Sequence, residues 1–122
     1  MTYDEYNEFC RALPATSYVV QWGGSHVWKV GGKVFAIGGI EKTDQAAFIF
    51  KASELDFEFL KDHSGFRPAP YMASRGLKWI QQYETSNETD DELKFYIQES
   101  HRIVSLGLTK KKQKELGLNQ DR

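Results

Sequence analysis

Residues 28–39 read WKVGGKVFAIGG, and this stretch decides the fold because it sets a glycine pair between two strand-like runs. The runs, residues 26–30 and 33–38, are rich in β-branched and aromatic side chains, which favour β-strands. Gly31 and Gly32 tolerate the positive φ angles that a two-residue hairpin turn requires at both central positions. The stretch therefore predicts an antiparallel β-hairpin.

A phosphate-binding loop is the alternative interpretation of the same glycines. A P-loop needs the pattern G-x-x-x-x-G-K-[ST] followed by a helix, whereas Gly32 and Lys33 are followed by Val34 and further strand-forming residues. The dinucleotide-binding pattern G-x-G-x-x-G is absent as well. The sequence therefore favours the hairpin.

The register of this hairpin follows from its two-residue turn. The turn pairs Val30 with Lys33, Lys29 with Val34, and Trp28 with Phe35. Side chains alternate between the two faces of a strand. We therefore predict a core-facing set of Trp28, Phe35 and Ile37, and an outer set of Lys29, Val34 and Ala36.

The rest of the chain predicts helices around this sheet. Further strands are expected over 17–22, 46–51 and 77–83, and helices over 3–13, from 53 to about 64, and over 90–106. Capping patterns mark the three helix starts: Thr2 with Glu5, Ser53 with Asp56, and Thr89 with Glu92. In the second helix, Leu55, Phe59 and Leu60 are expected to form the buried side. The two prolines in residues 66–76 argue against a regular helix there.

The element order is therefore α-β-β-β-β-α-β-α. It predicts an α+β fold, a two-layer domain with an antiparallel β-sheet packed against helices. The length of 122 residues suits one domain over 1–122. Residues 109–122 are expected to be a loosely ordered basic tail, with a short helix over 110–116 as the alternative.

Composition excludes several classes of protein. The net charge of −1 does not by itself suggest attraction to nucleic acid, although the last 22 residues are locally basic. Cys10 is the single cysteine, so no intrachain disulfide forms. No apolar run is long enough to span a membrane, and the acidic start MTYDEYNE does not resemble a signal peptide. We expect a cytoplasmic monomer that does not enter the membrane.

The residues show no evident active site, and we expect a protein that is not an enzyme and needs no cofactor. The three histidines lack the spacing of metal ligands, so no metal site is predicted. Cys10 lies on the apolar face of the first helix and is expected to be a buried thiol. The carboxylates of residues 90–92 are explained by a first helical turn, where negative charge is favourable. Trp22, Trp28 and Trp79 lie within strand-like runs, which favours core or half-buried packing, and stacking on bases is the alternative.

Several segments together resemble the MmcQ/YjbR family of small bacterial proteins. The matching pieces are RALP, Trp22-Gly23, HVWKVGGKVFA, Lys51 at a strand end, RPAPYMA, KWI, DELKFYIQESHRIV and LTKKK. The resemblance covers almost the whole chain. It implies a compact α+β domain of frataxin-like or secretion-chaperone-like arrangement, and a DNA-binding role by similarity to a double-wing arrangement of strands.

Double-stranded DNA is therefore the first expected partner. The basic residues that would contact phosphate lie in the segments carrying the resemblance and at the C-terminus: Lys29, Lys33, Lys51, Arg67, Arg75, Lys78, Lys110, Lys111 and Lys112. The alternative is a protein-interaction module of secretion-chaperone-like architecture without a nucleic-acid role. A third interpretation places Arg67, Tyr71 and Arg75 around an anion-binding pocket, against a loop that merely links helix and strand.

Overall fold

The computed structural model describes residues 1–39, 46–70, 76–84 and 90–120. These residues form, in chain order, α1 (Tyr3–Arg11), β1 (Thr16–Gln21), β2 (Ser25–Val30), β3 (Lys33–Gly38), β4 (Phe48–Lys51), α2 (Glu54–Leu60), β5 (Phe66–Pro68), β6 (Trp79–Gln82), α3 (Asp90–Leu106) and α4 (Lys110–Leu116). The predicted α+β class and the predicted element order are confirmed. The structure adds the short strand β5 within the region expected to be irregular, and it contains the alternative helix over 110–116.

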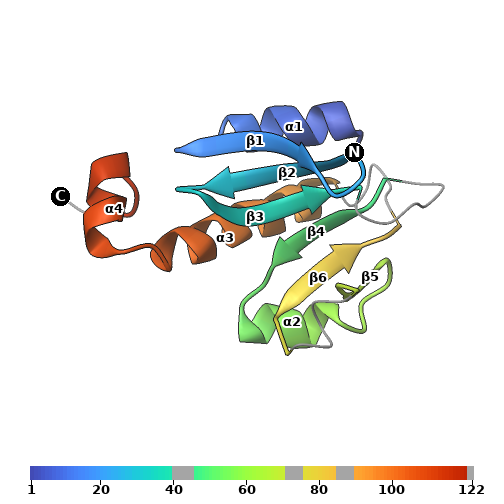
Figure 1. The fold of residues 1–122 in the computed structure, drawn as a ribbon. Coiled ribbons are helices and arrows are strands. Elements are labelled where there is room, and N and C mark those ends of the chain that lie inside the picture. The colour runs from blue at the N-terminus through green and yellow to red at the C-terminus, as the bar shows by residue number, and fades with distance from the viewer. Residues whose placement is uncertain (40–45, 71–75, 85–89, 121–122) are drawn as a thin grey trace.

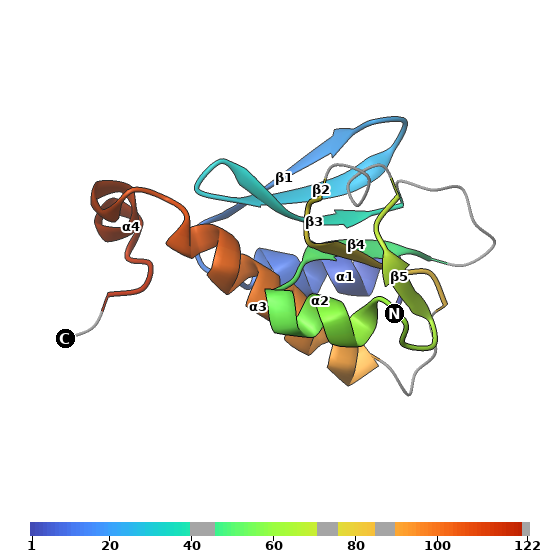
Figure 2. The same cartoon turned by 90° about the horizontal axis from the view of Figure 1, so that it is seen from below.

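The six strands make one antiparallel sheet in the order β1-β2-β3-β4-β6-β5. Helices α1, α2 and α3 lie together on one face of the sheet, and α4 lies beyond the end of the β2–β3 hairpin (Figures 1 and 2). The domain therefore has two layers, and one face of its sheet is turned away from α1–α3. We call this second face the open face.

Local capping explains where the first two helices begin. The Thr2 hydroxyl accepts the backbone N–H of Glu5, and the Glu5 carboxylate accepts the backbone N–H of Thr2. The Ser53 hydroxyl accepts the N–H of Asp56 in the same way. These contacts satisfy helical N–H groups that have no partner within the helix. Both predicted caps are confirmed, whereas Thr89 lies outside the described residues.

The main hydrophobic core fills the space between the sheet and the helices. Its largest fully buried side chains are Tyr6, Trp28, Phe35, Phe48, Phe50, Leu60, Ile80, Leu93 and Ile97. Hydrogen bonds lock two of the aromatic rings, because Trp28 Nε1 donates to Asn7 Oδ1 at 2.9 Å and the Tyr6 hydroxyl donates to the His26 carbonyl at 2.9 Å. The core thus binds α1 to β2 by packing and by polar contacts.

The β2–β3 hairpin is confirmed, but its register differs from the predicted one beyond the second pair. Gly31 and Gly32 have φ angles of +57° and +88°, as the turn requires. A β-bulge between Trp28 and Lys29 then shifts the pairing, so that Trp28 lies opposite Ala36. Phe35 and Ala36 consequently both belong to the main core, whereas Ile37 belongs to a cluster on the open face. The predicted set of Trp28, Phe35 and Ile37 on one face, with Ala36 on the other, was wrong because a bulge inserts one residue into one strand.

Two further expectations about burial were wrong. In α2 the buried residues are Phe57 and Leu60, while Leu55 is 81% exposed and Phe59 is 58% exposed. Trp22 lies after β1 rather than within a strand, has a φ of +51°, and is 56% exposed. Both errors concern which side chains meet the core, which depends on the tertiary packing.

Helix α4 docks against the turn of the β2–β3 hairpin. A Cβ atom added at Gly31 would lie 2.6 Å from Leu108 Cδ1 and 3.2 Å from Leu116 Cδ1, so a larger residue at this position would displace these leucine side chains. Thr109 caps the start of α4, and Gly117 ends it with a φ of +70°. The basic C-terminal segment is thus placed at the hairpin end of the sheet.

Candidate nucleic-acid interface

Charges are segregated between the sheet and the helices that cover it. The strands contain no aspartate or glutamate; their lysines and arginine are Lys29, Lys33, Lys51 and Arg67. In α1–α3 the carboxylates are Asp4, Glu5, Glu8, Glu54, Asp56, Glu58, Asp90, Asp91, Glu92 and Glu99, and the basic residues are Arg11, Lys94 and Arg102. The molecule therefore combines a basic sheet with an acidic helical layer.

Three of the predicted site residues share the open face. The apolar cluster of that face contains Val27 of β2, Ile49 of β4 and Ala69 beside β5. Side chains two positions apart on a strand point to the same face. Lys29, Lys51 and Arg67 therefore lie on the open face with this cluster.

Lys29 and Lys51 occupy neighbouring positions across β3. Lys29 pairs with Val34, and Lys51 follows Phe50, which pairs with Ala36. Two strand spacings separate β2 from β4, so the two backbones are about 10 Å apart. The half-buried side chain of Val34 lies between them on the same face.

Aromatic and amide groups accompany the basic residues on β5 and β6. Lys51 pairs with Trp79, which packs against the open-face cluster and is partly exposed. Arg67 Nε donates to Gln81 Oε1 at 2.8 Å, and its guanidinium carbon lies 4.8 Å from the centre of the Tyr83 ring. These two contacts orient the Arg67 guanidinium, and stacking on a ring is worth about 0.5–1 kcal/mol at an exposed site.

The remaining predicted residues do not join this set. Lys33 Nζ donates to the Gly107 carbonyl at 3.3 Å, so Lys33 ties the hairpin to the end of α3. Lys78 Nζ lies 4.7 Å from the centre of the Phe57 ring and therefore faces α2. Arg75 lies outside the described residues, as does Tyr71 of the alternative anion pocket.

Lys110, Lys111 and Lys112 form the first turn of α4, and all three are exposed. Because α4 docks at Gly31, these three lysines lie beside the turn of the β2–β3 hairpin. Lys29 lies two residues before Gly31 in the same hairpin. Of the nine predicted basic residues, six lie at the open face or at the adjoining hairpin end: Lys29, Lys51, Arg67, Lys110, Lys111 and Lys112.

Sequence reasoning missed the residues that support Arg67. Gln81 and Tyr83 were not proposed, although the alternation Trp79, Gln81, Tyr83 in one strand-like run was a usable signal. Their link to Arg67 needed the pairing of β5 with β6, which places Arg67 opposite Gln81. That pairing joins segments that the sequence alone did not connect.

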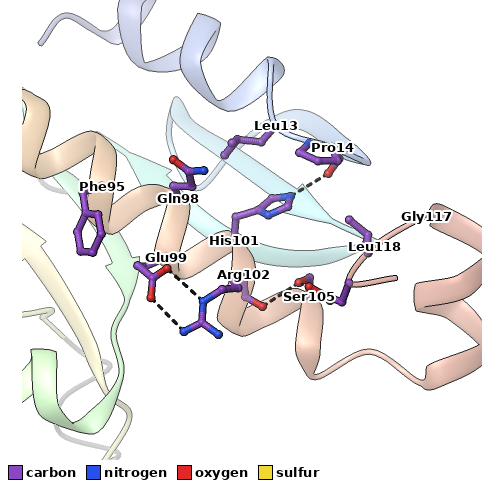
Figure 3. A pocket seen from close by; sticks show the side chains of 11 residues that line it. Leu13, Pro14, Phe95, Gln98, Glu99, His101, Arg102, Ser105, Gly117 and Leu118 are labelled. Atoms are coloured by element: carbon purple, nitrogen blue, oxygen red, sulfur yellow. Dashed lines mark hydrogen bonds and ion pairs between the residues drawn. The ribbon is translucent and has the colours of Figure 1, made fainter. Parts of the chain in front are cut away.

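A pocket of about 410 Å³ lies away from the open face, between α3, the end of α1 and the residues after α4 (Figure 3). Several of its polar side chains bind one another or the backbone. Arg102 donates to both carboxylate oxygens of Glu99 at 3.1 and 3.0 Å, and His101 Nε2 donates to the Pro14 carbonyl at 2.8 Å. Burial lowers the pKa of His101, so its ring is neutral at pH 7. These groups stabilise the junction of α1 and α3, and we assign the pocket no ligand.

Cys10 and the other two histidines have their own environments within the fold. Burial raises the pKa of the Cys10 thiol well above its usual range, which makes the thiolate inaccessible at neutral pH. His26 Nδ1 lies 2.7 Å from the Tyr18 hydroxyl, and His63 Nε2 lies 3.6 Å from Glu92 Oε1. Within residues 1–39, 46–70, 76–84 and 90–120, no group of three potential metal ligands occurs, and no helix is long and apolar enough to cross a bilayer.

Comparison with known proteins agrees with this architecture. The structure of Deinococcus radiodurans protein DR2400, with a DUF419 domain, superposes with a TM-score of 0.81 at 23% identity, over 99% of this chain and 91% of that chain. At this identity the similarity concerns the fold. No protein with curated annotation matches the chain. The YjbR family model matches residues 11–103, which is more than half of the chain, and the protein belongs to the YjbR family.

Proposed function

We propose that this protein binds double-stranded DNA through the open face of its sheet and the adjoining lysines of α4, without a catalytic step. The observation that carries the proposal is the segregation of charge: the strands hold lysine and arginine but no carboxylate. A uniformly mixed surface of net charge −1 would repel a polyanion from most directions. A one-sided basic surface instead allows the sheet to approach phosphates while the acidic helices face away.

The geometry of the open face suits contacts to a phosphate backbone. Lys29 and Lys51 lie about 10 Å apart across the strands, and Arg67 is oriented by Gln81 and Tyr83. Arginine and lysine are among the side chains that contact DNA phosphates, and such contacts position the protein without reading sequence. The proposal therefore predicts salt-dependent binding with little sequence preference from these residues.

The lysines of α4 extend this surface past the hairpin turn. Lys110, Lys111 and Lys112 are exposed, and the nearest described carboxylate in the same helix is Glu115 at its other end. Helix α4 adjoins the hairpin that carries Lys29. The sheet face and α4 would thus contact successive phosphates along one backbone.

Fluorescence anisotropy with a labelled duplex, measured over a salt series, tests the proposal. We expect micromolar binding at low salt that weakens steeply as salt is added. In a Lys29→Gln/Lys51→Gln variant, the slope of log K against log salt should fall by about two, because each lost phosphate contact removes about 0.9. Neither lysine belongs to the main core, so the variant should fold normally.

The matched control is Lys94→Gln, which removes an exposed lysine from α3 on the acidic side of the molecule. This control should bind as the parent does. Absence of binding at low salt, or equal loss in the control and in the double variant, would contradict the proposal. The protein-interaction alternative would then lead, since Leu55 and Phe59 expose apolar surface on α2.

A further inference from the structure

The two edges of the sheet are built differently. Strand β5, at one edge, is three residues long and contains Arg67 and Pro68. Strand β1, at the other edge, spans six residues, TSYVVQ, and contains neither charge nor proline. In monomeric proteins, edge strands are usually short or carry charged residues or proline, and these features prevent pairing with another chain. The β5 edge has these features, and the β1 edge lacks them.

The backbone of β1 presents hydrogen-bonding groups on its free side. The Gly31 N–H donates to the Ala15 carbonyl at 3.3 Å, in the same register as the β1–β2 pairing. In an antiparallel pair, hydrogen-bonded and non-bonded positions alternate along the strand. The N–H and C=O groups of Thr16, Tyr18 and Val20 therefore point away from β2, out of the β1 edge of the sheet.

Apolar side chains accompany these backbone groups. Tyr18 is 40% exposed and Val20 is 54% exposed. Tyr18 is held in place, because its hydroxyl lies 2.7 Å from His26 Nδ1 and its ring centre lies 5.0 Å from that of Trp28. The edge thus combines free backbone groups with an ordered apolar surface, as strand addition requires.

We propose that β1 pairs antiparallel with β1 of a second copy of this chain, across a two-fold axis at Val19. This register sets Tyr18 of each copy opposite Val20 of the partner subunit, with the outward backbone groups of both residues facing each other. A two-fold interface must be self-complementary, and an aromatic residue opposite a β-branched one is a favourable cross-strand pair. Because β1 is uncharged, bringing two copies together creates no like-charge repulsion within the strand pair.

The β1 edge therefore favours a dimer, whereas the sequence led us to expect a monomer. The proposal does not depend on DNA binding. The sheets of the two copies would form one continuous sheet, with their open faces on the same side. The interface consists of one strand pair and its side chains, which places it at the small end of specific interfaces, so we expect dissociation in the micromolar range.

Light scattering coupled to size exclusion, with sedimentation velocity over a concentration series, tests this pairing without DNA. The apparent mass should rise from 14.1 kDa towards twice that value as concentration increases. Val20→Pro should abolish the rise, because the lost N–H faces the free edge and the β1–β2 hydrogen bonds are retained. Val20→Lys should also abolish it by placing a charge beside the two-fold axis.

The control variant is Leu55→Lys, which replaces a more exposed apolar side chain on α2, away from β1. It should dimerise as the parent does, and circular dichroism should show that all three variants are folded. If Val20→Pro does not fold, Val20→Lys alone decides. A parent mass that stays at 14.1 kDa into the millimolar range would overturn the proposal, as would a dimer that persists in Val20→Lys or dissociates equally in Leu55→Lys.

Discussion

Ser100 joins the helical layer to the sheet through a single hydroxyl group. Its Oγ donates to the Phe35 carbonyl at 2.6 Å and accepts the Lys51 N–H at 2.8 Å, and the side chain is fully buried. Phe35 is the extra residue that the bulge leaves unpaired in the β2–β3 ladder. The serine therefore bridges the backbones of β3 and β4 just beyond their last residue pair, Ala36 with Phe50, and it also fixes the backbone position from which Lys51 projects.

Replacing Ser100 with alanine should destabilise the fold far more than an ordinary serine substitution. The change leaves a buried carbonyl and a buried N–H without their partner, and each such group costs about 1–3 kcal/mol. We therefore expect the free energy of unfolding, measured by urea denaturation, to fall by about 2–4 kcal/mol. Ser17→Ala, on an exposed position of β1, is the control and should change little. A loss in Ser100→Ala as small as that in the control would show that the two backbone groups find other partners.

At the scale of single elements, the sequence predicted what is determined locally. The glycine pair gave the hairpin, and the Thr2 and Ser53 caps gave two helix starts, because each depends on residues adjacent in sequence. The buried side of α2 was not predictable in this way. Leu55 and Phe59 have helical spacing, yet Phe57 and Leu60 face the core, since the neighbouring β5 and β6 decide the orientation. The bulge was missed because nothing in the hairpin sequence itself marks an inserted residue.

The hairpin turn packs against α4, and substitutions at the two neighbouring glycines of the turn test this contact. Gly31→Ala places a Cβ against Leu108 and Leu116, whereas a Cβ at Gly32 meets no atom within 4 Å. Both residues have positive φ, so both variants carry a conformational penalty of about 1–2 kcal/mol. Only Gly31→Ala should also loosen α4. Hydrogen exchange should therefore become faster in residues 110–116 for Gly31→Ala and remain unchanged there for Gly32→Ala. Equal exchange in the two variants would contradict docking of α4 at Gly31.

At the scale of the whole molecule, a net charge near zero conceals a strong asymmetry. The sequence identified the basic residues, and strand alternation placed Lys29 on the outer face of the hairpin. Adding Lys51 and Arg67 to that face required the order β3-β4-β6-β5, which brings together segments far apart in the chain. Sequence could not tell that Lys33 and Lys78 are engaged by Gly107 and Phe57. Those contacts depend on packing between elements. The set of lysines chosen from the sequence is therefore larger than the set available on the candidate surface.

At the scale of the whole molecule, the lysines of α4 give the most discriminating prediction. Their positive charge would strengthen DNA binding but weaken the stability of the fold. Lys110, Lys111 and Lys112 occupy the first turn of a helix, where the macrodipole disfavours positive charge. Changing all three to glutamine should raise the free energy of unfolding by about 0.5–1 kcal/mol. The same variant should bind duplex DNA more weakly, with a salt slope reduced by up to about three.

Lys114→Gln is the control that shows whether a gain in stability comes from the position of the lysines in the first turn or from the removal of any lysine. Lys114 lies in the last turn of α4, where positive charge interacts favourably with the helix dipole. Its replacement should slightly lower stability rather than raise it, while any effect on DNA binding should have the same sign as in the triple variant. Thermal denaturation and anisotropy on both variants therefore decide the matter together. If the triple variant gained stability and kept full DNA affinity, α4 would have to be removed from the binding surface, leaving only the sheet face.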